Sequence, residues 1–470
     1  MRTGFETFFS TRSDGGDGPD AVRPMTEGID GTGVLSMVDH WPALVRVLIV
    51  FFAILAAIRK KVSLGNAFFF GSVALGFLFS MGPADVAVSV FRSFTHAKTL
   101  SLAAIVSLIL VLSHSLEAVG QMERLLSSFQ GLVRTPQFNL VIFPSLIGLL
   151  PMPGGAIFSA PMVKTLGRAF RFTGDQLSYI NYWFRHVWEY WWPLYPGVLL
   201  TTTLAGLDLW VFVLALFPMT VVAVAAGYLP LSFPAEAAAQ DSNPSSGAAS
   251  GKQPPLRPFL RELTPIAMAI LGGLGLGFVL SLTLPSKISI AKELGLIVAL
   301  AASILWVWHG GGLSAGERLR ILKRRQLWDM FYMVGSILVF KGILEDAHAV
   351  EAISRELLAM KIPLMPITVI LPFLVGMVAG ITIAFVGTTF PILISLVHSF
   401  GEAQGILGYM MLALVSGFIG VLLSPLHLCL LLSNEYFGTS LTKVLRLVAR
   451  PCAVLLVCSM AYFFFLRGLL

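Results

Sequence analysis

Apolar runs long enough to cross a membrane constrain this chain more than any other feature. They recur at about residues 41–58, 62–82, 99–116, 177–203, 207–229, 262–284, 290–309, 327–344, 405–433 and 447–467. A hydrocarbon core about 30 Å thick needs roughly 20 apolar residues per helix, so each run is a candidate span. Only 12% of the residues are charged, about half the share usual in soluble domains. We therefore expect an all-α polytopic membrane protein.

Two further apolar stretches, 138–163 and 363–399, do not have the sequence of continuous helices. The first contains Pro151, Pro153, Gly154 and Gly155 within five positions. Proline removes a backbone donor and glycine adds backbone freedom, so the helical hydrogen-bond ladder breaks there. In lipid, an opened backbone is tolerated only where protein or a water-filled cavity covers it. The stretch therefore predicts a re-entrant segment that forms part of a binding site; a simple kink is the alternative.

The order of these elements repeats along the chain. Adding 228 to a residue number carries Pro144 to Pro372 and Gly148 to Gly376, as expected of an internal duplication. Each half then has five spans, an odd number, so the second half has the opposite orientation. We predict two inverted repeats of about five transmembrane helices plus one re-entrant or broken helical hairpin each, giving about ten spans and two hairpins.

The predicted organisation has four parts. A disordered acidic tail at 1–33 precedes a first membrane repeat at 34–229, a flexible linker at 230–258 and a second membrane repeat at 259–470. The formal net charge is +7, but the basic residues fall in short loops between apolar runs. That pattern indicates membrane orientation rather than nucleic-acid binding. With the N-terminus outside, the linker and the dense basic loops are cytoplasmic, and the two hairpins enter from opposite sides.

Two strings in the first half resemble a known family. They are LPMPGGAIFSAPMV at 150–163 and FRHVWEYWWPLYPG at 184–197, and they are similar to the prokaryotic integral membrane family called domain of unknown function 401, grouped with the ion transporter superfamily. The resemblance implies two re-entrant hairpins, a transport domain that moves against a scaffold, a possible homodimer and location in the prokaryotic inner membrane. It names no solute.

The first broken segment and the span that follows it supply one set of candidate site residues. A half-helix beginning after Gly155 would direct free N–H groups toward an anion, and Ser159 could add a hydroxyl. Charged groups within a span are functional candidates by default. Arg185 could attract an anionic solute while His186 or Glu189 carries a coupling proton. The alternative is an ion pair between Arg185 and Glu189 that only holds helices together.

The second broken segment, in which Gly380, Gly387 and Pro391 can interrupt the helix, supplies the other set of candidates. Gly387 allows close backbone approach, and hydroxyls of Thr382, Thr388 and Thr389 could coordinate Na⁺. Buried threonine more often bonds its own preceding carbonyl, which is the alternative. His427 occupies the position of Tyr195 in the repeat and could carry a proton or simply pack. The three cysteines, Cys429, Cys452 and Cys458, have spacings that match no metal or disulfide framework and are interpreted as core residues.

These patterns predict a secondary active transporter of a small anionic solute coupled to Na⁺ or H⁺, which binds where the two hairpins meet. Its expected partners are that solute, the coupling ion and the bilayer; we expect no cofactor and no nucleic acid. No G-x-x-x-x-G-K-[ST] phosphate loop is present, which disfavours a primary pump. A membrane-embedded enzyme using His186 and Glu189, or a channel, remains the alternative; no H-E-x-x-H metal motif supports the enzyme.

Overall fold

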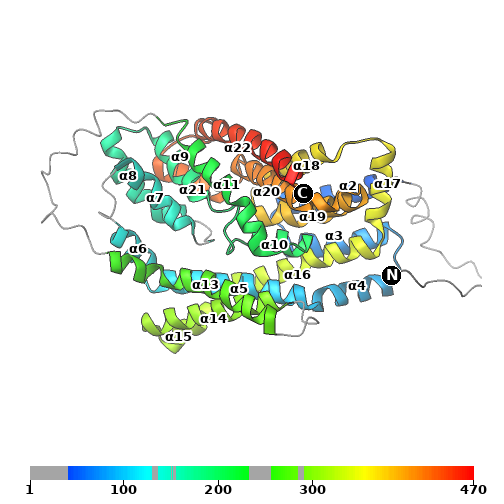
Figure 1. Ribbon diagram of the computed structural model, residues 1–470, viewed down its shortest axis with the longest axis horizontal. Coiled ribbons are helices and arrows are strands. Elements are labelled where there is room, and N and C mark those ends of the chain that lie inside the picture. Colours follow the sequence, from blue (N-terminus) through cyan, green and yellow to red (C-terminus); the bar gives the residue numbers. More distant parts are fainter. Residues whose placement is uncertain are drawn as a thin grey trace, which may run out of the picture.

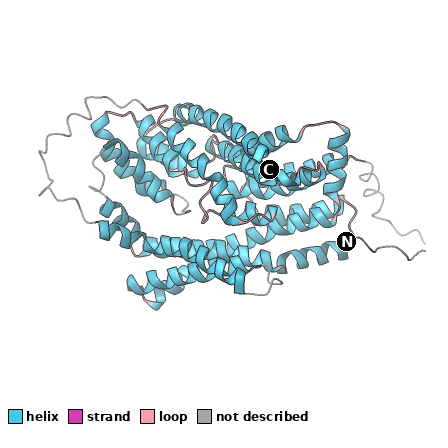
Figure 2. Cartoon of the chain, in the orientation of Figure 1, coloured by secondary structure: helices cyan, strands magenta, loops and turns pink. Residues whose placement is uncertain are grey.

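The computed structural model describes residues 41–129, 136–149, 151, 155–231, 256–283 and 290–469. Within these ranges every regular element is a helix (Figure 2). Eight of the described helical segments are long and apolar enough to cross a membrane. The predicted all-α, multi-pass class is therefore confirmed. The predicted tail at 1–33 and most of the predicted linker lie outside the described residues, as do Pro153 and Gly154.

The helices of the first half are α2 (Ala43–Arg59), α3 (Leu64–Leu78), α4 (Pro83–Thr95), α5 (Ala97–Ala118), α6 (Gln121–Phe129), α7 (Pro136–Gly148), α8 (Ala156–Gly167), α9 (Gly174–Arg185), α10 (Pro196–Ala205) and α11 (Leu209–Gly227). Those of the second half are α13 (Leu256–Thr283), α14 (Ala291–Gly310), α15 (Ala315–Leu322), α16 (Arg325–Asp346), α17 (Ala349–Ala359), α18 (Leu364–Ala379), α19 (Thr382–Ser399), α20 (Ile406–Leu422), α21 (Leu428–Phe437) and α22 (Leu441–Leu469).

Both predicted broken segments are divided into two helices. α7 ends at Gly148 and α8 begins at Ala156, so the cluster of proline and glycine falls between them. α18 ends at Ala379 and is capped by Gly380, whose φ of 66° lies in the left-handed region that glycine adopts without strain. Gly387 and Pro391 were expected to interrupt the second segment as well. That expectation was wrong, because both lie inside the continuous helix α19.

Two runs expected as single spans, 177–203 and 405–433, are also interrupted. α9 stops at Arg185, and α10 begins only at Pro196, which occupies the first helical turn. Proline has no N–H to donate, and in the first helical turn that N–H would have no intrahelical partner anyway, so this is a favourable position for it. In the second run, α20 and α21 are separated by residues 423–427, which include Pro425. Each of these runs is therefore a pair of short helices with a non-helical turn.

The start positions of helices in the two halves differ by nearly constant amounts. The difference is 228 for α5 and α16 (97 and 325), for α6 and α17 (121 and 349) and for α7 and α18 (136 and 364). It is 232 for α9 and α20 (174 and 406), for α10 and α21 (196 and 428) and for α11 and α22 (209 and 441). The starts of α8 and α19 differ by 226 (156 and 382), so the offset changes between the starts of α7 and α9 in one half and of α18 and α20 in the other.

Helices of one half pack against helices of the other half, and these pairings are reciprocal. α3 packs against α16, and its counterpart in order, α14, packs against α5. α8 packs against α21, and α19 packs against α10. Figure 1 shows α6, α7 and α8 in the left half of the molecule and α17, α18 and α19 in the right half. The helix pairs α7–α8 and α18–α19 therefore approach the middle of the molecule from opposite ends.

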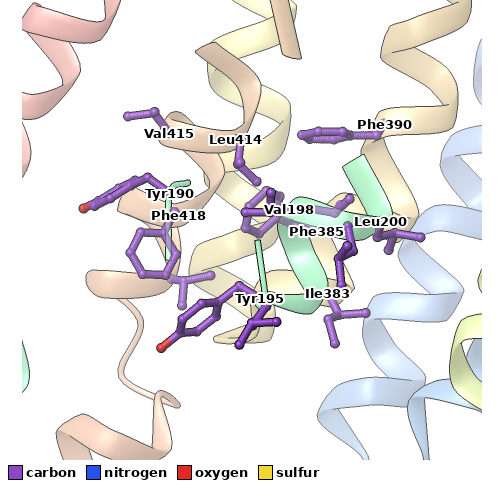
Figure 3. Packing of buried hydrophobic residues seen from close by; sticks show 14 of the residues in the cluster. Tyr190, Tyr195, Val198, Leu200, Ile383, Phe385, Phe390, Leu414, Val415 and Phe418 are labelled. Atoms are coloured by element: carbon purple, nitrogen blue, oxygen red, sulfur yellow. The ribbon is translucent and has the colours of Figure 1, made fainter. Parts of the chain in front are cut away.

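A buried apolar core surrounds the middle of the molecule. Val198 and Leu200 of α10 lie among Phe385 and Phe390 of α19 and Phe418 of α20 (Figure 3). Helices from both halves thus enclose the same region.

Glycines bring backbones into close contact on either side of this core. A Cβ on Gly148 would lie 2.0 Å from the carbonyl oxygen of Arg185, and one on Gly376 would lie 2.1 Å from that of Gly417. The two glycines differ by 228 in number and their partners by 232. The same backbone approach therefore joins α7 to α9 in one half and α18 to α20 in the other.

Candidate functional site

A cluster of polar side chains lies between the two helix breaks. Arg185 and His186 stand at the end of α9, and His427 stands just before α21. Their exposed fractions are only 3%, 2% and 8%. Charged and titratable groups are rarely buried this far unless they are paired or functional. The interruption of the 177–203 run is what places His186 in a turn rather than on a helix face.

The two histidines face each other across the halves. Their ring centroids are 4.8 Å apart at an interplanar angle of 80°. His186 Nδ1 lies 2.5 Å from the carbonyl oxygen of Tyr182, and a carbonyl only accepts, so Nδ1 donates. The Nε2 atom of His186 then faces Glu189, 3.7 Å from Oε1.

The tautomer of His427 follows from its contacts with Tyr182. The Tyr182 hydroxyl donates its one proton to the carbonyl oxygen of Leu422 at 3.1 Å, so it accepts from His427 Nδ1, also at 3.1 Å. The carbonyl oxygen of Val421, 3.3 Å away, is a second acceptor for the same N–H. Both imidazoles are therefore protonated on Nδ1 and have Nε2 available for proton transfer or ligation.

Glu189 connects this cluster to the second hairpin. The hydroxyl of Thr382, the first residue of α19, donates to Glu189 Oε2 at 3.1 Å. The structure thus brings together Glu189, Thr382 and both histidines, which the sequence placed in separate segments. The sequence spacing would let Arg185 and Glu189 meet on one helix face, but α9 ends at Arg185 and the residues between the two form a turn.

Arg185 lies directly against the tip of the first hairpin. A Cβ built on Gly155 would be 2.5 Å from Nη2 of Arg185, so this position needs glycine for the guanidinium to stay where it is. α8 begins at the next residue, Ala156, and its first N–H groups have no intrahelical partner. A fixed cation and a helix N-terminus therefore lie side by side, a combination suited to negative charge.

Ser159 is part of a buried polar network rather than an isolated hydroxyl. Its Oγ donates to Asn181 Oδ1 at 2.6 Å. Asn181 Nδ2 donates to the carbonyl oxygen of Ala156 at 3.0 Å and to Ser433 Oγ at 2.9 Å. These bonds join α8, α9 and α21. In this structure Ser159 fastens the first hairpin to its neighbours.

Three candidates from the second hairpin make other contacts. The hydroxyls of Thr388 and Thr389 donate to the carbonyl oxygens of Ala384 and Phe385 at 2.8 Å, one turn earlier in their own helix. A Cβ on Gly387 would meet the side chain of Ile337 at 3.0 Å. These positions thus contribute to packing in this structure. Pro151, on the first hairpin, is partly buried and lies outside any helix.

Cys429 joins the cluster and was missed by sequence reasoning. One ligating atom from each of His186, His427 and Cys429 lies within 4.8 Å of the others, and all three residues are buried. His427 and Cys429 are two positions apart, but His186 is more than 200 residues away, so no local spacing indicates the group. The equivalence of Tyr195 and His427 places the two regions at corresponding positions of the halves, but it does not indicate that His186 lies near Cys429.

The described cavities lie away from this cluster. One, of about 410 Å³, is lined by parts of α5, α10, α13 and α14 and includes Lys98, Asp208 and Lys292. A second, of about 210 Å³, is lined by α4, α5 and α16 and includes Arg92 and Lys341. In the central cluster, Arg185, His186 and His427 are instead almost fully buried. We give its buried, converging polar groups more weight than the cavities, because specific chemistry needs positioned groups.

One string has the spacing of a catalytic motif but not its structure. Residues 312–316, Gly-Leu-Ser-Ala-Gly, match G-x-S-x-G. That motif requires a strand, a sharp turn and a helix. Here α14 precedes the string, and the exposed Ser314 caps α15 by exchanging hydrogen bonds with Glu317. The serine is a helix cap.

Comparison with known proteins identifies a family but no annotated relative. The family described as "Protein of unknown function (DUF401)" matches residues 43–245 and 269–464. The two matched regions cover nearly all of both halves, including every residue of the central cluster. No curated protein matches this chain.

Proposed function

The chain belongs to the DUF401 family, a protein family of unknown function, and on the geometry of its centre we propose that it is a secondary active transporter. The proposed substrate is a small anionic solute, and the proposed coupling ion is Na⁺ or H⁺. The observation that carries this proposal is the buried cluster of Arg185, His186, Glu189 and His427 between two broken helix pairs. Ionisable groups at membrane depth mark substrate and ion pathways.

Several features expected of an inverted duplication support the proposed transport mechanism. The constant offsets of 228 and 232, the exchanged helix contacts and the two hairpins at opposite ends are the features expected of two repeats of opposite orientation. Such repeats bind substrate at their interface near the bilayer midplane, where discontinuous helices expose backbone groups. On this basis we propose five crossings and one hairpin per half, with the breaks in α9–α10 and α20–α21 inside single crossings.

The charge at the first hairpin favours an anion. Arg185 provides a fixed cation against Gly155, and the N-terminus of α8 lies beside it. The planar guanidinium suits a carboxylate or phosphate because it can donate two parallel hydrogen bonds. We propose that the solute's anionic group binds between Arg185 and the first turn of α8.

The coupling ion is proposed to bind at Glu189. Its two oxygens face His186 on one side and the Thr382 hydroxyl on the other. A proton could pass between the Nε2 atoms of the histidines and the carboxylate, or Na⁺ could bind between the carboxylate and the hydroxyl. Either ion would connect the α9–α10 turn to the second hairpin, so its binding would be coupled to hairpin movement.

The proposed orientation places the N-terminus outside and the linker in the cytoplasm of a prokaryotic inner membrane. The first hairpin would then enter from the cytoplasmic side and the second from outside. A homodimer is proposed only on the resemblance to the wider transporter superfamily. Because Arg185, His186 and His427 are buried in this structure, we propose that movement of the hairpins opens the cluster alternately to each side.

Purified full-length protein in liposomes tests the proposal. A panel of radiolabelled organic anions is presented with an imposed Na⁺ gradient, an imposed pH gradient or neither. We expect uptake of at least one anion that depends on one gradient and is lost in Arg185→Gln. The matched control, Arg325→Gln, changes an arginine whose side chain is 92% exposed and is expected to leave uptake intact. Ion current independent of any solute gradient would contradict a carrier and indicate a channel.

A further inference from the structure

The centre of the molecule has the donor set of a metal site. We propose that His186, His427 and Cys429 bind a thiophilic divalent cation of the Zn²⁺ class. Their ligating atoms already lie within 4.8 Å of one another, and the three residues are 2%, 8% and 7% exposed. This proposal does not depend on transport activity, because it concerns only these side chains.

The hydrogen bonds of the two histidines orient them for ligation. His186 Nδ1 donates to the carbonyl oxygen of Tyr182, and His427 Nδ1 is held by the Tyr182 hydroxyl and the Val421 carbonyl. Metal-bound histidines almost always donate their other ring N–H to such a partner, which fixes the tautomer and the ring plane. Here both rings have Nε2 free of a proton, as ligation requires.

The types of ligand favour Zn²⁺ over the alkali and alkaline-earth cations. Two imidazole nitrogens and one thiolate are borderline and soft donors, whereas Na⁺, Mg²⁺ and Ca²⁺ prefer oxygen. Tetrahedral Zn²⁺ holds nitrogen at about 2.0–2.1 Å and sulfur at about 2.3 Å, which sets ligand separations of roughly 3.5 Å. The cluster must therefore contract by about 1 Å, within the reach of side-chain rotation. Glu189 Oε1, 3.7 Å from His186 Nε2, is placed to become the fourth ligand.

Metal binding at this site exchanges one proton for the cation. The Cys429 S–H bond breaks, the proton leaves to solvent, and the sulfur lone pair forms the bond to the metal. The carboxylate of Glu189 and the guanidinium of Arg185 are the charged groups that flank the cluster. Their charges oppose each other, so the added charge of the metal is offset mainly by the new thiolate.

The site would bridge the two halves of the chain. His186 comes from the break between α9 and α10, while His427 and Cys429 come from the break between α20 and α21. A bound ion would hold the two turns at a fixed separation. Any movement that separates these turns is then blocked, so Zn²⁺ is also expected to inhibit transport.

Binding is tested with Co²⁺, which replaces Zn²⁺ and reports its ligands by absorption. The full-length protein, with any affinity tag removed, is titrated with CoCl₂ in detergent. We expect one Co²⁺ per chain, visible bands of tetrahedral geometry, a near-ultraviolet thiolate-to-cobalt band and displacement of all bands by ZnCl₂. Cys429→Ser should abolish the thiolate band. Cys452→Ser, which removes another buried cysteine, is the matched control and should keep it.

Histidine variants keep the test decisive if Cys429→Ser does not fold. His186→Gln and His427→Gln should each weaken Co²⁺ binding by tenfold or more while retaining a monodisperse elution profile. A wild-type protein without a thiolate band at saturating Co²⁺ would overturn the proposal. So would binding that is unchanged in both histidine variants. Because the readout is spectroscopic, failure of the transport assay would leave this result standing, and the reverse also holds.

Discussion

The contact between Gly155 and Arg185 shows how one missing side chain can position a charge. The guanidinium occupies the space that a Cβ would take, 2.5 Å from Nη2. Arg185 is also almost fully buried, so its guanidinium has little room to move elsewhere. In a membrane interior the position of such a charge decides what the site attracts. If Arg185 binds the proposed solute, Gly155 sets the position of that charge even though it has no side chain to bind with.

Replacement of Gly155 by alanine should weaken solute binding without preventing membrane insertion. The added methyl group displaces the guanidinium, and misplacement by about 1 Å can cost a large factor in a preorganised site. We expect the KM for anionic solutes to rise by about tenfold or more, equivalent to ~1.4 kcal/mol. Uptake kinetics in liposomes measure this, with protein yield and elution profile as controls. An unchanged KM would remove Arg185 from the proposed solute site.

Glu189→Gln separates the coupling role from the packing role of this carboxyl group. Glutamine retains an oxygen that can accept from the Thr382 hydroxyl but has no charge and exchanges no proton. We therefore expect gradient-driven uptake to fall at least tenfold while melting temperature stays close to that of the wild type. Exchange of solute between equal pools on both sides would continue. If gradient-driven uptake persisted in full, Glu189 would not carry the coupling ion.

Among single residues, Arg185, His186, Glu189 and His427 could be singled out from sequence because charged or titratable groups are rare in apolar runs. Cys429 could not, since a cysteine in an apolar run has the same pattern as a core residue. Its proposed role as a metal ligand depends on the approach of His186, more than 200 positions away. Thr388 and Thr389 show the opposite case: their hydroxyls suggested ligands, but each bonds its own helix.

At the scale of helices, paired glycines set how closely α7 approaches α9 and α18 approaches α20. The built Cβ atoms on Gly148 and Gly376 meet backbone carbonyl oxygens at 2.0 and 2.1 Å. Backbone is harder to displace than a side-chain end, so the helices would have to separate. Close approach through small residues is a common way for membrane helices to gain packing contacts.

Gly148→Ala and Gly376→Ala should each destabilise the protein by about 1–3 kcal/mol, as overpacking commonly does. The lower stability is measured as a lower melting temperature in detergent. Gly275→Ala in α13 is the matched control, because a Cβ there meets nothing within 4 Å. Alanine also favours helix over glycine, so this control should melt at the same temperature or higher. Equal melting of all three variants would contradict the packing argument.

Asp208 joins the two halves at the start of α11. Its Oδ1 accepts from the backbone N–H groups of Trp210 and Val211 at 2.9 and 3.1 Å, and its Oδ2 pairs with Lys292 of α14. Partial burial raises the pKa of Asp208, but the hydrogen bond from Lys292 and those from the backbone outweigh it. The pKa is therefore held below its ordinary value.

This lowered pKa predicts a loss of stability in acid. A carboxyl group with a lower pKa in the folded protein stabilises it above the unfolded pKa, and the contribution disappears as pH falls through the folded pKa. We expect melting temperature to drop below about pH 4, the ordinary range of aspartate. Asp208→Asn, which keeps a capping oxygen, should reduce this drop. Asp208→Ala should cost about 1 kcal/mol at neutral pH through loss of the cap. An identical acid profile in Asp208→Asn would assign the drop to other groups.

Helix breaks were predictable where several breakers come together and less so elsewhere. Four prolines and glycines within five residues predicted the gap between α7 and α8. The gap between α9 and α10 was missed because hydrophobicity continues through Trp188, Trp191 and Trp192. At Gly387 and Pro391 a break was expected but the helix is continuous. A long buried helix can accommodate isolated helix-breaking residues when neighbouring helices pack around it.

At the scale of the whole molecule, the recurrence of similar helices in the two halves could be predicted because matching residues recur at a nearly constant offset in the sequence. The mutual placement of the halves could not, because contacts such as α3 with α16 depend on packing between distant segments. The proposed orientation remains open to a direct test.

Cysteine labelling tests that orientation. In a variant lacking the three native cysteines, Ser10→Cys in the tail and Ser246→Cys in the linker are exposed to a membrane-impermeant maleimide. In a bacterial host, Ser10→Cys should react when only the inner membrane is intact, and Ser246→Cys only after that membrane is permeabilised. Transport activity of each variant is the control for folding. The reverse labelling pattern would invert the proposed topology, and labelling of both on the same side would contradict the odd number of crossings in the first half.

The two hairpins differ in the length of their second helix, α8 or α19. This difference bears on which side of the membrane the proposed carrier faces at rest. α8 has 12 residues and α19 has 18, so at 1.5 Å per residue the second arm is about 9 Å longer. If the two hairpins were identical, the outward-facing and inward-facing states would be related by the symmetry of the repeats and would have equal free energy. Hairpins of unequal length bury different amounts of protein surface in the two states. We therefore expect a resting population biased toward one side, and a carrier that loads more readily from one compartment than from the other.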